Sequence, residues 1–186
     1  MSTTETVERL PRRNLTLFAS SQTILSELRH HLETTSDSEV VRFALRYLDQ
    51  LIADQEAGRS LIIQPIGGKP FIVSYQSLKG REGEDQETVK RNIVVNQAAI
   101  DRMEHMKRAV GVSSDSEIVR RSLRYLHLVM SEANKGSTFV LDEDGEPVIV
   151  RMDIFAKPSI RQVAAQAFRG VRLPVRMGFG AAPQPI

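Results

Sequence analysis

The sequence contains no cysteine among its 186 residues, which removes disulfide bonds, thiolate nucleophiles and cysteine-ligated zinc from consideration. No run of about eighteen apolar residues is present, so we expect no membrane-spanning helix. Residues 1–8 lack the basic and apolar regions that are typical of a secretory signal. Together these absences favour a cytoplasmic protein without a membrane partner.

Motifs for catalysis are also missing. The chain has no Gly-x-Ser-x-Gly, no phosphate-binding glycine loop and no spaced pair of acids suited to a pocket. The histidines form no His-x3-His pair and occupy no matching positions in the repeat described below. These are His30, His31, His105 and His127. We therefore expect neither an enzyme nor a metal site, and no cofactor.

The charge of the chain is unevenly distributed. Residues 151–186 carry six basic residues against one acid, and residues 91–126 carry seven against four. Residues 13–48 carry four of each. A basic second half indicates a polyanionic partner, although a solvated surface would give the same pattern.

The chain contains an internal repeat of about sixty residues. Residues 35–48 match residues 113–126 at ten of fourteen positions, with an offset of 78. The same offset aligns Arg13-Asn-Leu-Thr-Leu with Arg91-Asn-Ile-Val-Val without a gap. Because a repeat of this kind determines the architecture, it is the strongest signal in the sequence.

Each copy predicts the same series of elements. An alternating stretch, 14–18 and 92–96, indicates a strand, and a helix of about a dozen residues follows it. Ser36-x-x-Glu39 and its counterpart Ser114-x-x-Glu117 have the spacing of a capping box, which predicts the start of a second helix. Each copy then ends in a hairpin, with turns at Gly67-Gly68 and Asp144-Gly145.

One strand and two helices cannot bury their own apolar face, so the two copies should associate. We expect their strands to pair antiparallel and their four helices to interlock, as a dimer within one chain. The predicted fold is therefore α+β, with two tandem repeats that each carry a hairpin. The expected segments are a flexible N-terminus (1–11), repeat 1 with its hairpin (12–73), an exposed linker (74–89), repeat 2 with its hairpin (90–150) and a basic tail (151–186).

The order of elements in each copy resembles the ribbon-helix-helix (Arc/MetJ-like) family of bacterial DNA-binding proteins. Each copy has a strand, a helix, a turn and then a second helix that begins with Ser-x-Ser-Glu and contains a Val-Arg pair. The resemblance covers residues 12–56 and 90–134, about half of the chain. Two copies in one register are similar to tandem TraY-type members. The resemblance implies a two-stranded ribbon that enters the major groove of double-stranded DNA, most often in a transcriptional repressor.

The resemblance also implies which residues contact DNA. With Leu15, Leu17, Ile93 and Val95 facing the core, the alternate residues should read bases. These are Asn14, Thr16, Phe18, Asn92, Val94 and Asn96. The family's phosphate anchor at the start of the second helix and the cations at the ribbon edge give the expected backbone contacts. These are Arg13, Arg91, Ser36, Ser38, Ser114 and Ser116. The outward triplets Asn-Thr-Phe and Asn-Val-Asn differ, so we expect an asymmetric site.

Three alternatives remain open from the sequence. The protein could be an accessory factor in plasmid transfer or partition, or an antitoxin-type module whose C-terminal segment binds a protein. The hairpins could also pair between chains, giving a homodimer with two ribbons. A short helix is expected over 158–168 in the basic tail, either packed on the hairpins or placed along DNA phosphates.

Overall fold

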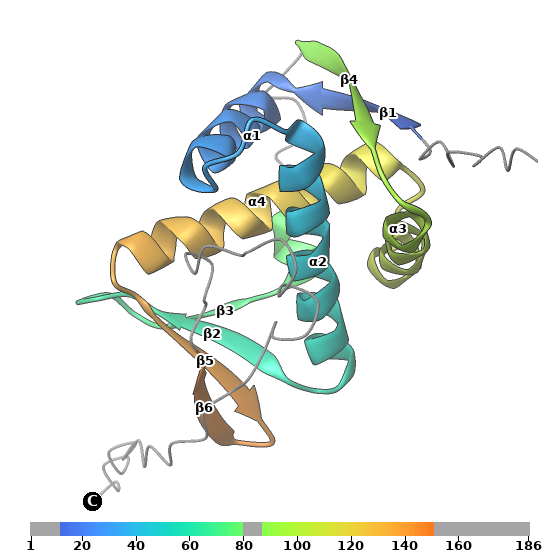
Figure 1. Ribbon diagram of the computed structural model, residues 1–186. Helices are drawn as coiled ribbons and strands as arrows, with labels where there is room; N and C mark the ends of the chain where they lie inside the picture. Colours follow the sequence, from blue (N-terminus) through green and yellow to red (C-terminus); the bar gives the residue numbers. More distant parts are fainter. Residues whose placement is uncertain (1–11, 80–86, 151–186) are drawn as a thin grey trace, which may run out of the picture.

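The computed structural model describes residues 12–79 and 87–150, so the N-terminal segment 1–11 and the basic tail 151–186 lie outside the described residues. The fold is α+β, with a two-stranded ribbon at one end, a four-stranded sheet at the other and helices between them (Figure 1).

The elements occur twice in the same order. The first series is β1 (Arg12–Phe18), α1 (Ala19–His31), α2 (Asp37–Glu56), β2 (Ser60–Gln64) and β3 (Phe71–Val73). After a short 3-10 helix, η1 (Tyr75–Leu78), the second series is β4 (Thr88–Val94), α3 (Gln97–Val110), α4 (Asp115–Asn134), β5 (Thr138–Glu143) and β6 (Glu146–Val150).

Both sheets join the first series to the second. The ribbon pairs β1 antiparallel to β4 with Asn14 opposite Asn92, and the four-stranded sheet, in the order β3-β2-β5-β6, places Ile62 opposite Val140. Each of these pairs is separated by the same 78 residues that separate the sequence repeats. The two sheets are therefore centred on equivalent positions of the two copies.

Local hydrogen bonds and backbone conformation mark the starts of the second helices and one hairpin turn. Ser36 and Ser114 each accept a hydrogen bond from the amide three residues ahead, at 3.3 and 3.4 Å, which confirms both predicted N-caps. The hairpin turn at Asp144-Gly145 has positive φ at both residues, 54° and 82°, as a two-residue type I′ turn requires.

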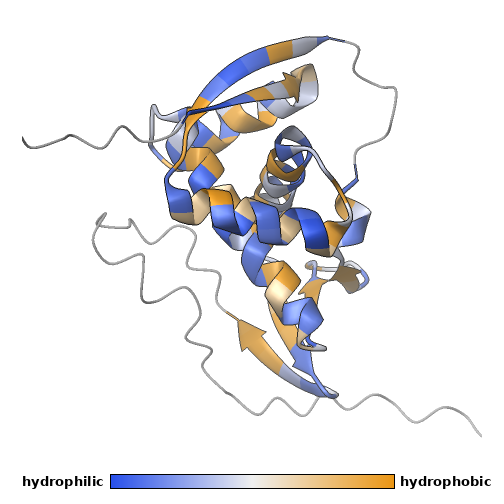
Figure 2. Cartoon of the chain, turned by 90° about the vertical axis from the view of Figure 1, so that its right-hand side faces the viewer, coloured by the Kyte–Doolittle hydropathy of each residue, from blue (hydrophilic) through white to orange (hydrophobic). Residues whose placement is uncertain are grey.

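The core lies between the ribbon and the inner face of the four-stranded sheet. One face of each second helix is buried in it, with these residues three or four apart: Val41, Ala44, Leu45, Leu48, Ile52, Val119, Ser122, Leu123, Leu126 and Met130. Colouring by hydropathy shows apolar residues on the helix faces that meet in the centre and along the strands of the four-stranded sheet (Figure 2).

Two expectations need correction. The hairpins pair with each other within one chain through β2 and β5, so these inner edges are not available to join two chains. The segment expected as an exposed linker, 74–89, is not uniformly exposed, because it contains η1, whose Leu78 is buried against the core. Its last two residues belong to β4, which begins at Thr88 rather than near residue 92.

Candidate nucleic-acid interface

The ribbon has one buried face and one open face. Leu15, Leu17 and Ile93 are at most 1% exposed on the side of the helices, as the alternation predicted. Four cross-strand pairs between β1 and β4 share the opposite strand phase. They are Arg12 with Val94, Asn14 with Asn92, Thr16 with Lys90 and, where β1 ends, Phe18 with Thr88.

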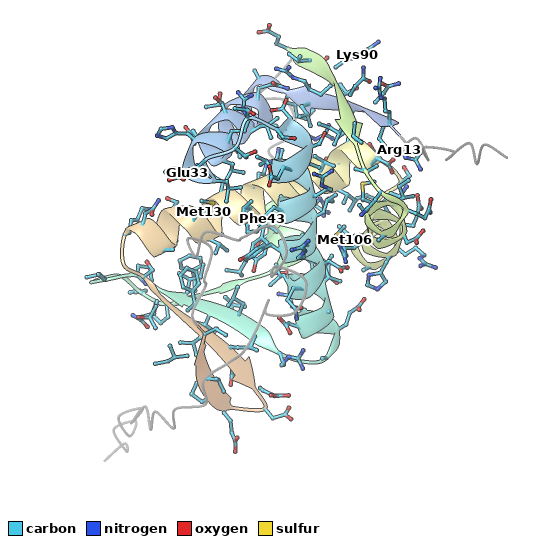
Figure 3. The ribbon with its side chains drawn as sticks, in the orientation of Figure 1. Arg13, Glu33, Phe43, Lys90, Met106 and Met130 are labelled. Atoms are coloured by element: carbon cyan, nitrogen blue, oxygen red, sulfur yellow. The ribbon has the colours of Figure 1, made fainter. Side chains whose placement is uncertain are left out.

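The open face carries polar groups and positive charge. Arg12, Asn14, Lys90 and Asn92 are exposed, and neither ribbon strand contains an acidic residue. Figure 3 shows Lys90 at the outer side of β4, at the end of the molecule farthest from the four-stranded sheet. The face therefore combines hydrogen-bonding amides with cations, without a carboxylate on either strand.

The two cations of the predicted backbone-contact set, Arg13 and Arg91, do not belong to the open face of the ribbon. Arg13 and Arg91 share the strand phase of Leu15 and Ile93, which face the helices, and Figure 3 shows Arg13 on that side of β1. Arg13 Nε lies 3.9 Å from the Asp115 carboxylate, and the Arg91 guanidinium donates to Gln22 Oε1 at 2.8 and 3.1 Å.

The outward cations are instead Arg12 and Lys90, which the sequence reading left out because it began each strand at the asparagine. Extending the period-2 alternation by one step toward the N-terminus would have found both.

Two residues predicted to read bases serve other contacts. Phe18 ends β1 half-buried, and the guanidinium of Arg120 lies 4.4 Å from the centre of its ring, within the range of a cation–π contact. Asn96 lies beyond β4, where its side chain caps α3 by accepting from the amide of Ala99 at 2.9 Å. Of the predicted reading set, Asn14, Thr16, Asn92 and Val94 remain on the open face.

Each second helix holds the ribbon strand of the other copy. The amide of Val94 donates to Ser38 Oγ at 3.0 Å, and Arg42 donates to the carbonyl of Val94 at 3.4 Å. At the equivalent positions, the amide of Thr16 donates to Ser116 Oγ at 2.9 Å and Arg120 donates to its carbonyl at 3.1 Å.

The hydroxyl oxygens of Ser38 and Ser116 therefore accept hydrogen bonds from the ribbon backbone. The Ser-x-x-x-Arg spacing is identical in the two copies, and that identity was the signal for this contact in the sequence.

These contacts place the N-terminal turn of α2 beside β4 and that of α4 beside β1. Amides in the first turn of a helix have no partner within the helix and carry a partial positive charge. The aspartate at the start of each second helix lies beside a cation. Asp37 lies 3.3 Å from Arg29, and Asp115 lies 2.7 Å from Lys107.

The carboxylate of Glu117 anchors the two arginines of α4. It accepts from Arg120 at 2.6 Å and from Arg121 at 2.8 Å. Burial acts to raise the pKa of Glu117, but the hydrogen bonds from Arg121 and Arg120 outweigh it and hold that pKa below its ordinary value. The charged carboxylate thus fixes Arg120, which in turn contacts the ribbon.

Comparisons of the chain with models of known protein families, with curated proteins and with solved structures found no match. Among the residues that the structure describes, no group of three or more histidine, aspartate and glutamate side chains is arranged to hold a metal ion. None of the described helices combines the length and apolar content needed to cross a bilayer.

Proposed function

We propose that the protein binds double-stranded DNA sequence-specifically, as a tandem ribbon-helix-helix protein that inserts β1 and β4 into the major groove. The observation that carries the proposal is the open ribbon face, which presents Asn14, Asn92, Arg12 and Lys90 on two strands without an acid. A two-stranded ribbon fits the major groove, where asparagine can bind adenine bidentately and arginine or lysine can bind guanine.

The two helix N-termini beside the ribbon support this mode of binding. A ribbon seated in the groove brings the first turns of α2 and α4 toward the flanking phosphates. The backbone amides that follow the N-caps Ser36 and Ser114 would then donate hydrogen bonds to those phosphates. Phosphate contacts of this kind fix the register of a protein on DNA without reading its sequence.

The ribbon register favours a nearly palindromic target. Equivalent positions of the two strands hold Arg12 and Lys90, Asn14 and Asn92, and Thr16 and Val94. The residues within each pair are chemically similar. The two half-sites should therefore differ only where Arg12 is replaced by Lys90 and where the hydroxyl group of Thr16 is replaced by a methyl group of Val94. We propose half-sites that share an adenine contact and differ at the positions read by the other two pairs.

The role in the cell that suits such a protein best is that of a transcriptional regulator, most often a repressor. An accessory role in plasmid transfer or partition would use the same interface. An antitoxin-type role would need a protein partner for the C-terminal segment, which is basic.

Selection of bound duplexes from a randomised library, at several salt concentrations, tests the proposal. We expect one sequence family to be enriched. Asn14→Ala with Asn92→Ala should remove the enrichment, at a cost of roughly 1–3 kcal/mol of discrimination per asparagine, while the dependence of binding on salt persists.

Arg12→Ala with Lys90→Ala should reduce both the affinity and the salt slope. Lys69→Ala with Lys79→Ala is the matched control, because it removes two exposed cations away from the ribbon. If the unmodified protein binds no duplex above the non-specific background, or if the control pair weakens binding as much as the ribbon pair, the proposal is wrong.

A further inference from the structure

Two equivalent arginines reach the ribbon from the second helices, and they differ in how many groups hold them. Arg120 of α4 donates to the carbonyl of Thr16 at 3.1 Å, and Arg42 of α2 donates to the carbonyl of Val94 at 3.4 Å. The two arginines are separated by the repeat offset of 78, and so are Thr16 and Val94. Each end of the ribbon therefore has one such arginine.

Every nitrogen of the Arg120 guanidinium is used within the protein. Its Nε and Nη2 donate to Glu117 Oε2 at 3.2 and 2.6 Å, and its Nη1 makes the bond to Thr16. The guanidinium also lies 4.4 Å from the centre of the Phe18 ring, and the side chain is only 13% exposed. Arg120 thus has no nitrogen left over for a ligand.

The glutamate equivalent to Glu117 has a different partner in the first copy. Glu39 Oε2 accepts from the Thr34 hydroxyl at 2.6 Å, in the turn before α2. The equivalent of Thr34 is Val112, which has no hydroxyl group to offer Glu117. A single side chain in this turn therefore separates a glutamate that is held by the turn from one that is available to the arginine three residues on.

Arg42 is half-buried and keeps donors that Arg120 has already used. Among the residues that the structure describes, the bond from Nη1 to the Val94 carbonyl is the one hydrogen bond of its guanidinium. The equivalent of Phe18 is Asn96, whose side chain caps α3, so the ring that covers Arg120 has no counterpart here. Neither Nε nor Nη2 of Arg42 is a buried atom that lacks a partner. Two of its three nitrogens can therefore donate to a ligand.

We infer that Arg42 binds a backbone phosphate of the DNA half-site next to Val94, whereas Arg120 makes no such contact. This inference rests on the proposed insertion of β1 and β4 into the major groove. Val94 is the last residue of β4, and the ends of a ribbon seated in a groove about 12 Å wide come close to the flanking phosphates. A guanidinium with two free nitrogens matches the oxygens of a phosphate.

The consequence is a preferred orientation on DNA. The base-reading pairs of the open face are nearly symmetric, so they distinguish the two half-sites only weakly. A phosphate contact made by one copy alone holds one half-site more firmly than the other. Arg42 is therefore the residue that sets the direction of the protein on a nearly palindromic target.

The salt dependence of binding tests the inference, with the full-length protein and the duplex enriched from the randomised library. One phosphate contact contributes about 0.9 to the slope of log affinity against log salt concentration. Arg42→Gln should lose that contribution, so its affinity deficit should shrink about three- to fourfold between roughly 50 and 200 mM salt. Lys69→Gln is the matched control, because it removes one exposed cation from the β2–β3 turn, and it should leave the slope unchanged.

Thr34→Val is a second variant that leaves Arg42 in place. Without the hydroxyl, the Glu39 carboxylate is free to pair with Arg42, as Glu117 pairs with Arg120. The slope should then fall in the same direction as in Arg42→Gln, and combining the two substitutions should add little. Ethylation interference locates the contact, since Arg42→Gln should weaken interference at one phosphate of a single half-site. Thermal unfolding of each variant establishes that the compared proteins are folded.

The outcomes separate this inference from the proposed function. If the unmodified protein binds its enriched duplex but Arg42→Gln leaves the salt slope unchanged, the inference is wrong and the proposed function stands. Interference that weakens equally in both half-sites, or a slope that falls as far in Lys69→Gln, also overturns the inference alone. If no duplex is enriched by the unmodified protein, the proposed function and the inference fall together.

Discussion

The two copies of the repeat share their framework and differ in how each one is stabilised locally. Both bury one strand face, both cap the second helix with serine, and both hold the strand of the other copy through a Ser-x-x-x-Arg pair. The differences lie at helix ends and at buried charges. A duplication therefore fixes the contacts that need both copies, while positions that serve only one copy are free to diverge.

A buried acid near the end of each second helix shows such a divergence. Asp54 is 6% exposed and accepts from the Arg59 guanidinium at 2.6 and 3.0 Å. At the equivalent position Glu132 is 8% exposed, and it accepts from Ser137 at 2.7 Å and from Lys135 at 2.8 Å. Hydrogen bonds from Lys135 and Ser137 hold the pKa of Glu132 below its ordinary value. In the first copy one arginine donates twice to a single oxygen of the acid, to which Gln50 also donates; in the second copy a lysine and a serine donate to the acid.

The largest effect should come from the shared framework. Leu15 and Ile93 occupy equivalent buried positions of the ribbon. Replacing either residue with alanine should lower the free energy of unfolding by about 3 kcal/mol. Denaturant unfolding of the two variants measures this, with the exposed Asn14→Ala as a control near zero. If one variant lost several times more stability than the other, the two strands would not contribute equally to the core.

The next largest effect should be a difference in stability between variants that remove the cation beside each buried acid. Arg59→Ala leaves the Asp54 carboxylate without its cation and should cost about 2–3 kcal/mol. Lys135→Ala should cost under about 1 kcal/mol, because the lysine side chain is 64% exposed and Ser137 still donates to Glu132. Thermal and denaturant unfolding of both variants test the ranking, and equal costs would contradict the division of roles inferred above.

The Ser-x-x-x-Arg contacts should give a smaller and symmetric effect. Ser38→Ala and Ser116→Ala each leave a strand amide without its acceptor, at a cost of about 1 kcal/mol. Faster amide exchange at Val94 in the first variant and at Thr16 in the second would locate each loss. A rise in exchange within the mutated helix alone, with the ribbon unchanged, would contradict the cross-copy contact.

The smallest effect should be a gain in stability. Glu33 has a φ of 51°, whereas the equivalent residue of the second copy is Gly111, with a φ of 73°. Glycine adopts this left-handed conformation without the steric cost that a side chain carries, so Glu33→Gly should stabilise the fold by about 0.5–1 kcal/mol. Gly111→Ala should destabilise it by a similar amount. Glu33→Ala is the control, because it keeps a Cβ and should change little; a gain as large as that of the glycine variant would assign the effect to the lost charge.

The sequence alone was sufficient for much of this fold. The offset of 78, the period-2 strands and the capping serines predicted the order of the elements, the buried face of the ribbon and the starts of the second helices, because these features depend on local periodicity and on hydrogen bonds within a few residues. The same local signals identified Asn14, Thr16, Asn92 and Val94 as members of the open face.

Only the tertiary structure decided contacts between distant segments. The side chain of Asn96 has the outward spacing of a strand residue, yet it caps α3 because the strand ends before it. Ser38 and Ser116 look like free helix-start hydroxyls, but packing of the copies brings a strand amide to each. The pairing of β2 with β5 likewise joins the hairpins within one chain. Periodicity specifies which face of an element is apolar, whereas the partner of that face depends on how distant elements meet in space.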